Sequence, residues 1–291
     1  MDFPRSPKEA ETLIRESEDR FTRSLRQTAK WALEENASLL TVSGPTCSGK
    51  TTAAARLWKE LKQTGRTVVP FSFDDFFCDR PRDNVITASP PDYDTVQALD
   101  LSCLAEALEN LRKGKEARIP VYDFVSGRRA GYRIHSPVPG ELYLWEGIQA
   151  VYPEVLTLLG RSAPDIVLDV EPPAEWNMTG ADIRLCRRIL RDVRCRSASP
   201  AFTLFLWQSV RENELRNIEP HMHKAGIRIG SCMAYEPYIL ADFLLPILTE
   251  IRQESTGKAD WLAEALTRFR NAHVKPAMIP KDSIFREFIG P

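Results

Sequence analysis

The chain has 291 residues, 43% hydrophobic and 27% charged, which is the composition of a globular protein with one large domain or two smaller ones. Its 39 basic and 40 acidic side chains leave a net charge of -1, which excludes a global electrostatic attraction to nucleic acid or to an anionic membrane. The six cysteines form no C-x-x-C pair and no metal-ligand spacing, so we expect reduced thiols in a cytoplasmic protein.

The N-terminal residues 1–36 are predicted to form one or two amphipathic, charge-rich helices, an extension ahead of the first strand. Residues 1–20 lack the apolar h-region of a signal peptide, so we do not expect export. The apolar stretch 238–248 is too short for a membrane span, and we expect a core helix there.

Apolar runs rich in β-branched or aromatic residues predict five strands, at residues 39–43, 67–73, 142–145, 166–170 and 227–230. Helices are predicted between most of them, at residues 52–62, 99–112, 154–159 and 182–194. This alternation predicts an α/β fold, with a mostly parallel sheet covered by helices on both faces. We expect this domain to occupy residues 37–250, followed by a C-terminal helix and tail at 251–291.

Two insertions, 78–98 and 119–140, are rich in Pro, Asp, Gly and Arg and are longer than connections in compact domains usually are. Ligands bind at the carboxyl ends of the strands in open α/β sheets. We therefore expect both insertions to bind substrate at that edge.

The segment after the first strand matches the phosphate-binding pattern G-x-x-x-x-G-K-T and opens a helix-prone run. In order, its residues are Gly44, Pro45, Thr46, Cys47, Ser48, Gly49, Lys50 and Thr51, and Thr52 follows. Backbone N–H groups and the positive helix end cradle phosphates in such loops, while the lysine reaches the outer phosphates and the threonine ligates magnesium. An ordinary glycine-rich turn explains neither Lys50 nor Thr51. The loop therefore predicts a site for ATP and Mg²⁺.

Acids follow two of the predicted strands. Asp74 and Asp75 end the second strand, where a carboxylate near the γ-phosphate can accept the proton of an attacking hydroxyl. Glu146 ends the third strand, where it can hold the magnesium shell opposite Thr51. The alternatives are a solvated turn for the aspartates and a capping acid for Glu146.

Four arginines, Arg184, Arg187, Arg188 and Arg191, follow the spacing that places side chains on one helix face. Arginines suit bidentate phosphate contacts and transition-state charge, so we expect an arginine-rich helical lid at residues 180–200 that closes over the triphosphate. A solvated basic face paired with surface acids is the alternative.

These motifs, in this order, resemble the uridine-cytidine kinases, within the wider phosphoribulokinase and uridine kinase group of P-loop NTPases, over residues 38–230. The matching segments are the phosphate loop, Asp74-Asp75-Phe76-Phe77, Tyr93-Asp94, Ile119-Pro120-Val121-Tyr122-Asp123-Phe124, Glu146-Gly147-Ile148 and Arg187-Arg188-Ile189-Leu190-Arg191-Asp192. Residues 210–214, 235–236 and 283–290 resemble a bacterial branch of uridine kinase-like proteins.

The resemblance implies roles for individual residues. Asp74 would be the catalytic base, and Lys50, Arg188 and Arg191 would stabilise the transferred phosphoryl group. Tyr93 and Asp94 would hold the ribose. Further expected contacts are Tyr122 and Arg188 to the acceptor, and Arg187 to ATP.

The chain departs from that family at three places. Gly127-Arg128-Arg129 stands where the family has a base-reading histidine, Arg196-Ser197-Ala198-Ser199 replaces R-G-R-D, and Ala225-Gly226-Ile227-Arg228 replaces A-D-V-I. Phosphoryl transfer is therefore better supported than the identity of the acceptor.

The sequence thus predicts ATP- and Mg²⁺-dependent phosphorylation of the 5′-hydroxyl of uridine or cytidine. The same transfer to another small alcohol or a sugar phosphate stays open, as do GTP as the donor and a homo-oligomer. A tRNA prenyltransferase, whose G-P-T-A-S-G-K-[ST] loop resembles residues 44–51, and a non-catalytic ATP-binding switch are further alternatives. We expect a small-molecule acceptor, and neither nucleic acid nor membrane as a partner.

Overall fold

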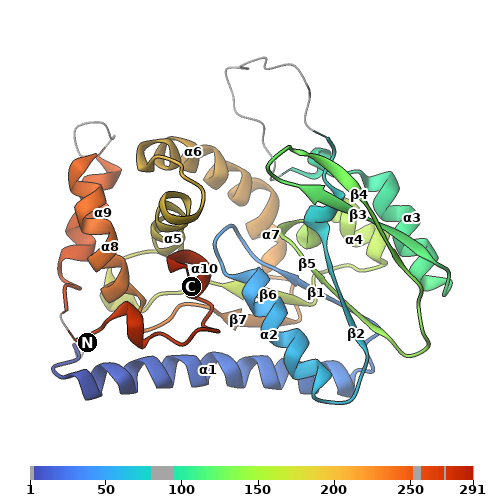
Figure 1. Cartoon of the computed structure of the whole chain (residues 1–291), viewed down its shortest axis with the longest axis horizontal. Coiled ribbons are helices and arrows are strands. Elements are labelled where there is room, and N and C mark those ends of the chain that lie inside the picture. The colour runs from blue at the N-terminus through green and yellow to red at the C-terminus, as the bar shows by residue number, and fades with distance from the viewer. Residues whose placement is uncertain (1–2, 80–94, 252–256, 272, 291) are drawn as a thin grey trace.

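The computed structural model describes residues 3–79, 95–251, 257–271 and 273–290 (Figure 1). Its main sheet has five parallel strands in the order β2-β5-β1-β6-β7, and β3 and β4 pair as an antiparallel hairpin. The strands are β1 Leu39–Ser43, β2 Val68–Ser72, β3 Ala117–Asp123, β4 Arg128–His135, β5 Leu142–Glu146, β6 Ile166–Asp169 and β7 Ile227–Gly230. The predicted parallel sheet is confirmed, and each predicted strand matches an observed one to within one residue at either end.

Helices pack on both faces of this sheet. Alternate residues of the strands point to opposite faces, and each face has its own apolar cluster. Leu40 and Leu144 lie in the cluster formed with α1, α2, α5 and α8. Phe71 and Trp145 lie in the cluster formed with α3 and α4. The helices are α1 Pro7–Glu34, α2 Lys50–Lys62, α3 Leu101–Arg112, α4 Pro153–Leu159, α5 Gly180–Cys195, α6 Pro200–Asn213, α7 Glu219–Met222, α8 Glu236–Glu250, α9 Lys258–Thr267 and α10 Arg286–Ile289. The arrangement is the predicted α/β fold.

The N-terminal extension is a single helix, α1. Ser6 caps it by accepting a hydrogen bond from the Glu9 amide, and the helix packs along α2 and β7 (Figure 1). The predicted core helix at residues 238–248 lies within α8. Across the described ranges, no helix combines the length and apolarity needed to cross a bilayer.

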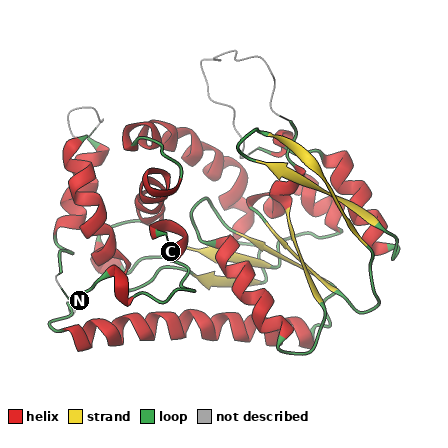
Figure 2. Ribbon diagram, in the orientation of Figure 1, coloured by secondary structure: helices red, strands yellow, loops and turns green. Residues whose placement is uncertain are grey.

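The second insertion is not a loop but the β3–β4 hairpin, which lies beside α3 (Figure 2). Its strands escaped the sequence analysis because only part of the hairpin is buried, and Arg, Gly and Pro interrupt the alternation of apolar residues. Gly127 closes the turn with φ +68°, in the left-handed region that favours glycine. The hairpin therefore presents a fixed set of side chains to the sheet.

Candidate active site

The phosphate loop joins β1 to α2 at the carboxyl edge of the sheet. Gly49 caps α2 with φ +86°, and Cys47, with φ +58°, also adopts the left-handed conformation. The Ser48 amide donates to the Pro45 carbonyl at 3.1 Å, which closes the turn of the loop. The loop thus lies at the positive end of a 13-residue helix, a setting that favours anions.

Two buried ion pairs hold this loop from behind. Arg184 pairs with Glu214, and Arg187 with Glu236, through two hydrogen bonds in each case. Arg184 also donates to the Thr46 carbonyl at 3.1 Å, and Glu214 accepts from the Thr46 amide at 3.1 Å. The side chains of all four charged residues are no more than 5% exposed. The backbone of the loop is therefore fixed by charges that come from α5 and from residues far along the chain.

Arg187 lies in the interior of the protein and holds the backbone of the phosphate loop. Its guanidinium is fully buried and donates to the Cys47 carbonyl at 3.0 Å and to the Ser231 carbonyl at 2.8 Å, besides Glu236. The sequence analysis expected Arg187 to contact ATP. The structure instead buries it behind the loop, where Glu236 neutralises its charge. The helix pattern could not reveal this partner, because Glu236 lies 49 residues further along the chain.

Arg188 and Arg191 differ from the two buried arginines. Their side chains are 14% and 15% exposed, and they meet Asp192 at 3.5 Å and Glu287 at 3.9 Å. The Nε atoms of both are buried and make no hydrogen bond with the described residues. The expected single arginine face is thus divided into two residues that hold the loop and two with unused donors.

The acids expected at the strand ends lie close together. Because β2 and β5 are paired in register, Ser72 stands opposite Glu146, and its hydroxyl donates to Glu146 Oε1 at 2.7 Å. The Thr51 hydroxyl donates to Glu146 Oε2 at 3.3 Å. Burial raises the pKa of Glu146, and the negative charge of Asp74 raises it further, whereas Ser72, Lys50 and Thr51 oppose this shift. The phosphate loop and both acidic strand ends therefore meet in one place.

The two adjacent aspartates have different partners. Asp74 Oδ1 accepts a hydrogen bond from the buried Gln149 at 3.0 Å. Asp75 pairs with Arg133 of the hairpin at 3.1 Å; burial raises the pKa of Asp75, and the Arg133 charge opposes this. Asp74 is thus the acid that faces Glu146, and Asp75 is occupied by the hairpin.

The hairpin contributes further groups at the same edge. Tyr122 is 7% exposed, packs against Phe77 and Phe124, and donates to the Cys78 carbonyl at 3.3 Å. Arg129 pairs with Asp100 at 2.9 Å. The two residues expected to hold the ribose, Tyr93 and Asp94, lie outside the described residues.

Thr51 and Glu146 suit a magnesium ion. Their oxygens lie 3.3 Å apart beside Lys50, and Mg²⁺ is commonly held by one or two carboxylates, waters and substrate phosphates. The described residues contain no group of three or more His, Cys, Asp or Glu that could hold a metal by themselves. The donor set therefore fits an ion that arrives with a nucleotide.

The sequence analysis missed several residues of this site. Gln149, Ser72, Glu214 and Glu236 each bind a predicted residue or the loop backbone, yet the sequence analysis gave none of them a role. Glu214 and Glu236 lie in the segments 210–214 and 235–236 that resemble the bacterial branch, and Ser72 ends a strand next to Asp74. Gln149 had no such signal.

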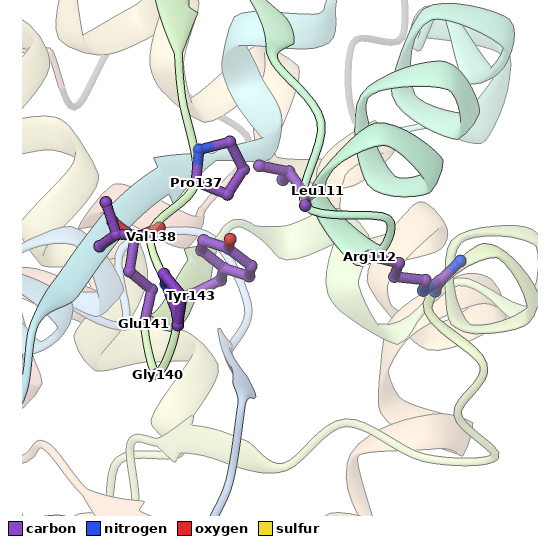
Figure 3. A pocket seen from close by; sticks show the side chains of 9 residues that line it. Leu111, Arg112, Pro137, Val138, Gly140, Glu141 and Tyr143 are labelled. Atoms are coloured by element: carbon purple, nitrogen blue, oxygen red, sulfur yellow. The ribbon is translucent and has the colours of Figure 1, made fainter.

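Two cavities are lined by described residues. One, of 290 Å³, lies between the end of α3 and the start of β5, at the opposite edge of the sheet from the phosphate loop (Figure 3). The other, of 380 Å³, lies next to the loop, and Pro45, Asp169, Arg184 and Arg228 are among its lining residues. Of these two cavities, only the second is lined by a residue of the phosphate loop, Pro45.

The sequence model of the phosphoribulokinase / uridine kinase family matches residues 39–234. The chain belongs to this family. Its relatives include uridine kinases from Brevibacillus brevis, 30% identical over 67% of this chain and 85% of that protein, and from Staphylococcus aureus, 30% identical over 66% and 86%. A solved structure from Bacillus stearothermophilus, described as a possible uridine kinase, covers 66% of this chain and 88% of its own at 18% identity and a TM-score of 0.46. Membership of the phosphoribulokinase / uridine kinase family and the names of these relatives indicate that the chain is a kinase.

Proposed function

We propose that this protein transfers the γ-phosphoryl group of ATP, with Mg²⁺, to the 5′-hydroxyl of a pyrimidine nucleoside. The observation that supports this most is the convergence of Thr51, Glu146 and Asp74 beside the phosphate loop. A pure nucleotide binder needs no base at that position, and the family assignment argues against a tRNA prenyltransferase.

Each group has a defined task in this proposal. The loop amides and Lys50 would bind the phosphates, and Thr51 and Glu146 would hold a magnesium ion, which would supply neutralisation of the phosphate charge. Gln149 donates to Asp74 Oδ1 and so fixes the carboxylate, leaving Oδ2 for the acceptor hydroxyl. As the acceptor oxygen bonds to the γ-phosphorus and the bond to the bridging oxygen breaks, Asp74 takes the hydroxyl proton and ADP leaves.

Arg188 and Arg191 are the arginines that we assign to the phosphoryl group in transit. Unlike Arg184 and Arg187, they are partly exposed and only loosely paired, at 3.5 Å to Asp192 and 3.9 Å to Glu287. In this proposal Tyr122, Phe77 and Phe124, which pack on one another, form an aromatic wall for the acceptor.

A different acceptor is the second candidate, and the hairpin supplies the observation that favours it. Gly127 has no side chain to read a base and is required by the turn, while Arg129 and Arg133 from β4 place guanidinium groups at this edge, paired with Asp100 and Asp75. Guanidinium groups suit a sugar phosphate or another anionic alcohol, which would compete with these carboxylates.

Paired variants of the two aspartates test the assignment. Asp74→Asn should lower kcat by about 10² or more with ATP affinity largely kept, because it removes a general base. Asp75→Asn is the matched control, with the same change one residue away. A larger loss of kcat in the Asp75 variant would contradict the choice of base.

A further inference from the structure

The segment Ser283–Gly290 packs directly against the phosphate loop. A Cβ atom at Gly49 would lie 2.4 Å from Cδ1 of Ile284, so these residues are in close contact. Ile284, Phe285 and Phe288 are fully buried, and Phe288 lies beneath the Arg187 guanidinium at 4.9 Å. The segment is therefore a fixed wall of the nucleotide site, beside α5 (Figure 1).

Glu287 projects from this wall onto Thr52, which directly follows the phosphate loop, and onto Arg191, which the proposed function gives to the transferred phosphoryl group. Its Oε2 accepts a hydrogen bond from the Thr52 hydroxyl at 2.9 Å, and its Oε1 lies 3.9 Å from Nη1 of Arg191. Thr52 is in the first turn of α2, where the helix dipole favours an anion. A carboxylate of the chain itself thus stands where an anionic ligand is expected.

Glu287 is also placed so that it can give up these contacts. Its side chain is 20% exposed, unlike the buried Phe285 and Phe288 of the same segment, and 3.9 Å is too long for a hydrogen bond to Arg191. The Arg191 Nε has no hydrogen-bond partner among the described residues. The pairing is therefore incomplete and easily replaced by a ligand with more acceptors.

We propose that Glu287 is a positioning residue of the nucleotide site, whose carboxylate holds Thr52 and Arg191 in the free protein and is exchanged for a phosphate of the incoming nucleotide. The proposal rests on the proposed function, since it requires that the phosphate loop and Arg191 bind the phosphates of ATP. Because a ligand must displace the carboxylate and approach its charge, Glu287 weakens nucleotide binding.

The test is calorimetric titration of the full chain with ATP and, separately, with inorganic tripolyphosphate. Glu287→Gln keeps the shape of the side chain and removes its charge, and it should bind both ligands roughly two- to fivefold more tightly, the scale of one charge at a helix end. Glu60→Gln is the matched control, since Glu60 lies near the far end of α2 and pairs with Arg26, and it should bind both as the wild type does. Glu287→Asp, which keeps the charge but shortens the reach, should show a smaller gain.

Unchanged or weaker ATP binding by Glu287→Gln overturns the proposal. So does a gain for ATP that is absent for tripolyphosphate, because the carboxylate would then face the nucleoside. ADP release is measured in parallel, so that failure of this proposal can be told from failure of the proposed function. If Glu287→Gln binds both ligands more tightly but the wild-type protein releases no ADP, the kinase mechanism is contradicted and the role of Glu287 stands.

Discussion

Replacing Arg187 by methionine should destabilise the fold, in contrast to the same change at Arg188. Arg187→Met leaves the fully buried Glu236 carboxylate without its partner, and breaking a buried pair in this way costs about 3–5 kcal/mol. The carbonyls of Cys47 and Ser231 lose hydrogen bonds at the same time. For a large domain each kcal/mol lowers the Tm by about 2 °C, so a loss of about 4 kcal/mol corresponds to a fall of about 8 °C.

Arg188→Met is the matched comparison, on the same helix and one residue away. Arg188 pairs with Asp192 at 3.5 Å within one helix turn, and Asp192 also pairs with Arg196 and accepts a hydrogen bond from Thr203. Its carboxylate therefore keeps partners in Arg188→Met, and the Tm should change by less than about 2 °C. Its kcat should fall by about 10² or more if it stabilises the transferred phosphoryl group. Thermal unfolding followed by circular dichroism, with turnover measured on the same preparations, gives both quantities.

The double variant Arg187→Met with Glu236→Leu provides a control on the cause. It removes both charges, so its stability loss should be smaller than the sum of the two single losses. A Tm within about 2 °C of the wild type for Arg187→Met, or a larger loss for Arg188→Met, would refute the division of the arginines into loop-holding and phosphate-facing pairs.

Three further predictions address other parts of the site. Lys50→Ala should abolish turnover and leave the far-ultraviolet circular dichroism unchanged, because the ammonium acts on phosphate charge and lies outside the core; near-normal activity would contradict the loop assignment. Glu146→Gln should abolish turnover but raise the Tm at pH 7 without magnesium. The raised pKa of Glu146 means that the folded state loses stability as pH rises from the ordinary value of 4.5 to the folded pKa, so the advantage of Gln should vanish below about pH 4. Gly127→Ala should cost about 1 kcal/mol through its positive φ and raise the KM of the acceptor more than that of ATP, and equal changes in both KM values would argue against a hairpin role in acceptor binding.

The main sheet could be predicted from sequence because its signals are local. Residues 39–43 form a continuous apolar run before a glycine-rich turn, and such runs are typical of strands buried on both faces. The hairpin was missed because Arg, Gly and Pro residues interrupt the apolar positions of its two strands, which are only partly buried. Its Gly127 was interpreted as a missing base reader, whereas the backbone of the turn requires glycine there.

The sequence predicts those parts of the site whose residues lie next to one another in the chain. The spacing of Gly49, Lys50 and Thr51 is a local pattern, and so is the run of acids at Asp74. Helical periodicity placed Arg187 on the same face as Arg191, but it could not show that Glu236, far along the chain, neutralises Arg187. Gln149 likewise binds Asp74 only through the fold, and nothing in its sequence context indicates that contact.

The most direct test of the proposed function is a turnover assay with Mg²⁺ and ATP against uridine, cytidine and a panel of small alcohols and sugar phosphates. Products are identified by mass, and ADP is measured alongside them. We expect ADP and nucleoside 5′-monophosphate in equal amounts from the wild-type protein, with the rate reduced by about 10² or more in Asp74→Asn. If a different alcohol is monophosphorylated with the same dependence on Asp74, the proposed phosphoryl transfer is supported and the proposed nucleoside acceptor is wrong. The absence of ADP release with every acceptor, from folded protein that binds ATP, would contradict phosphoryl transfer at this site.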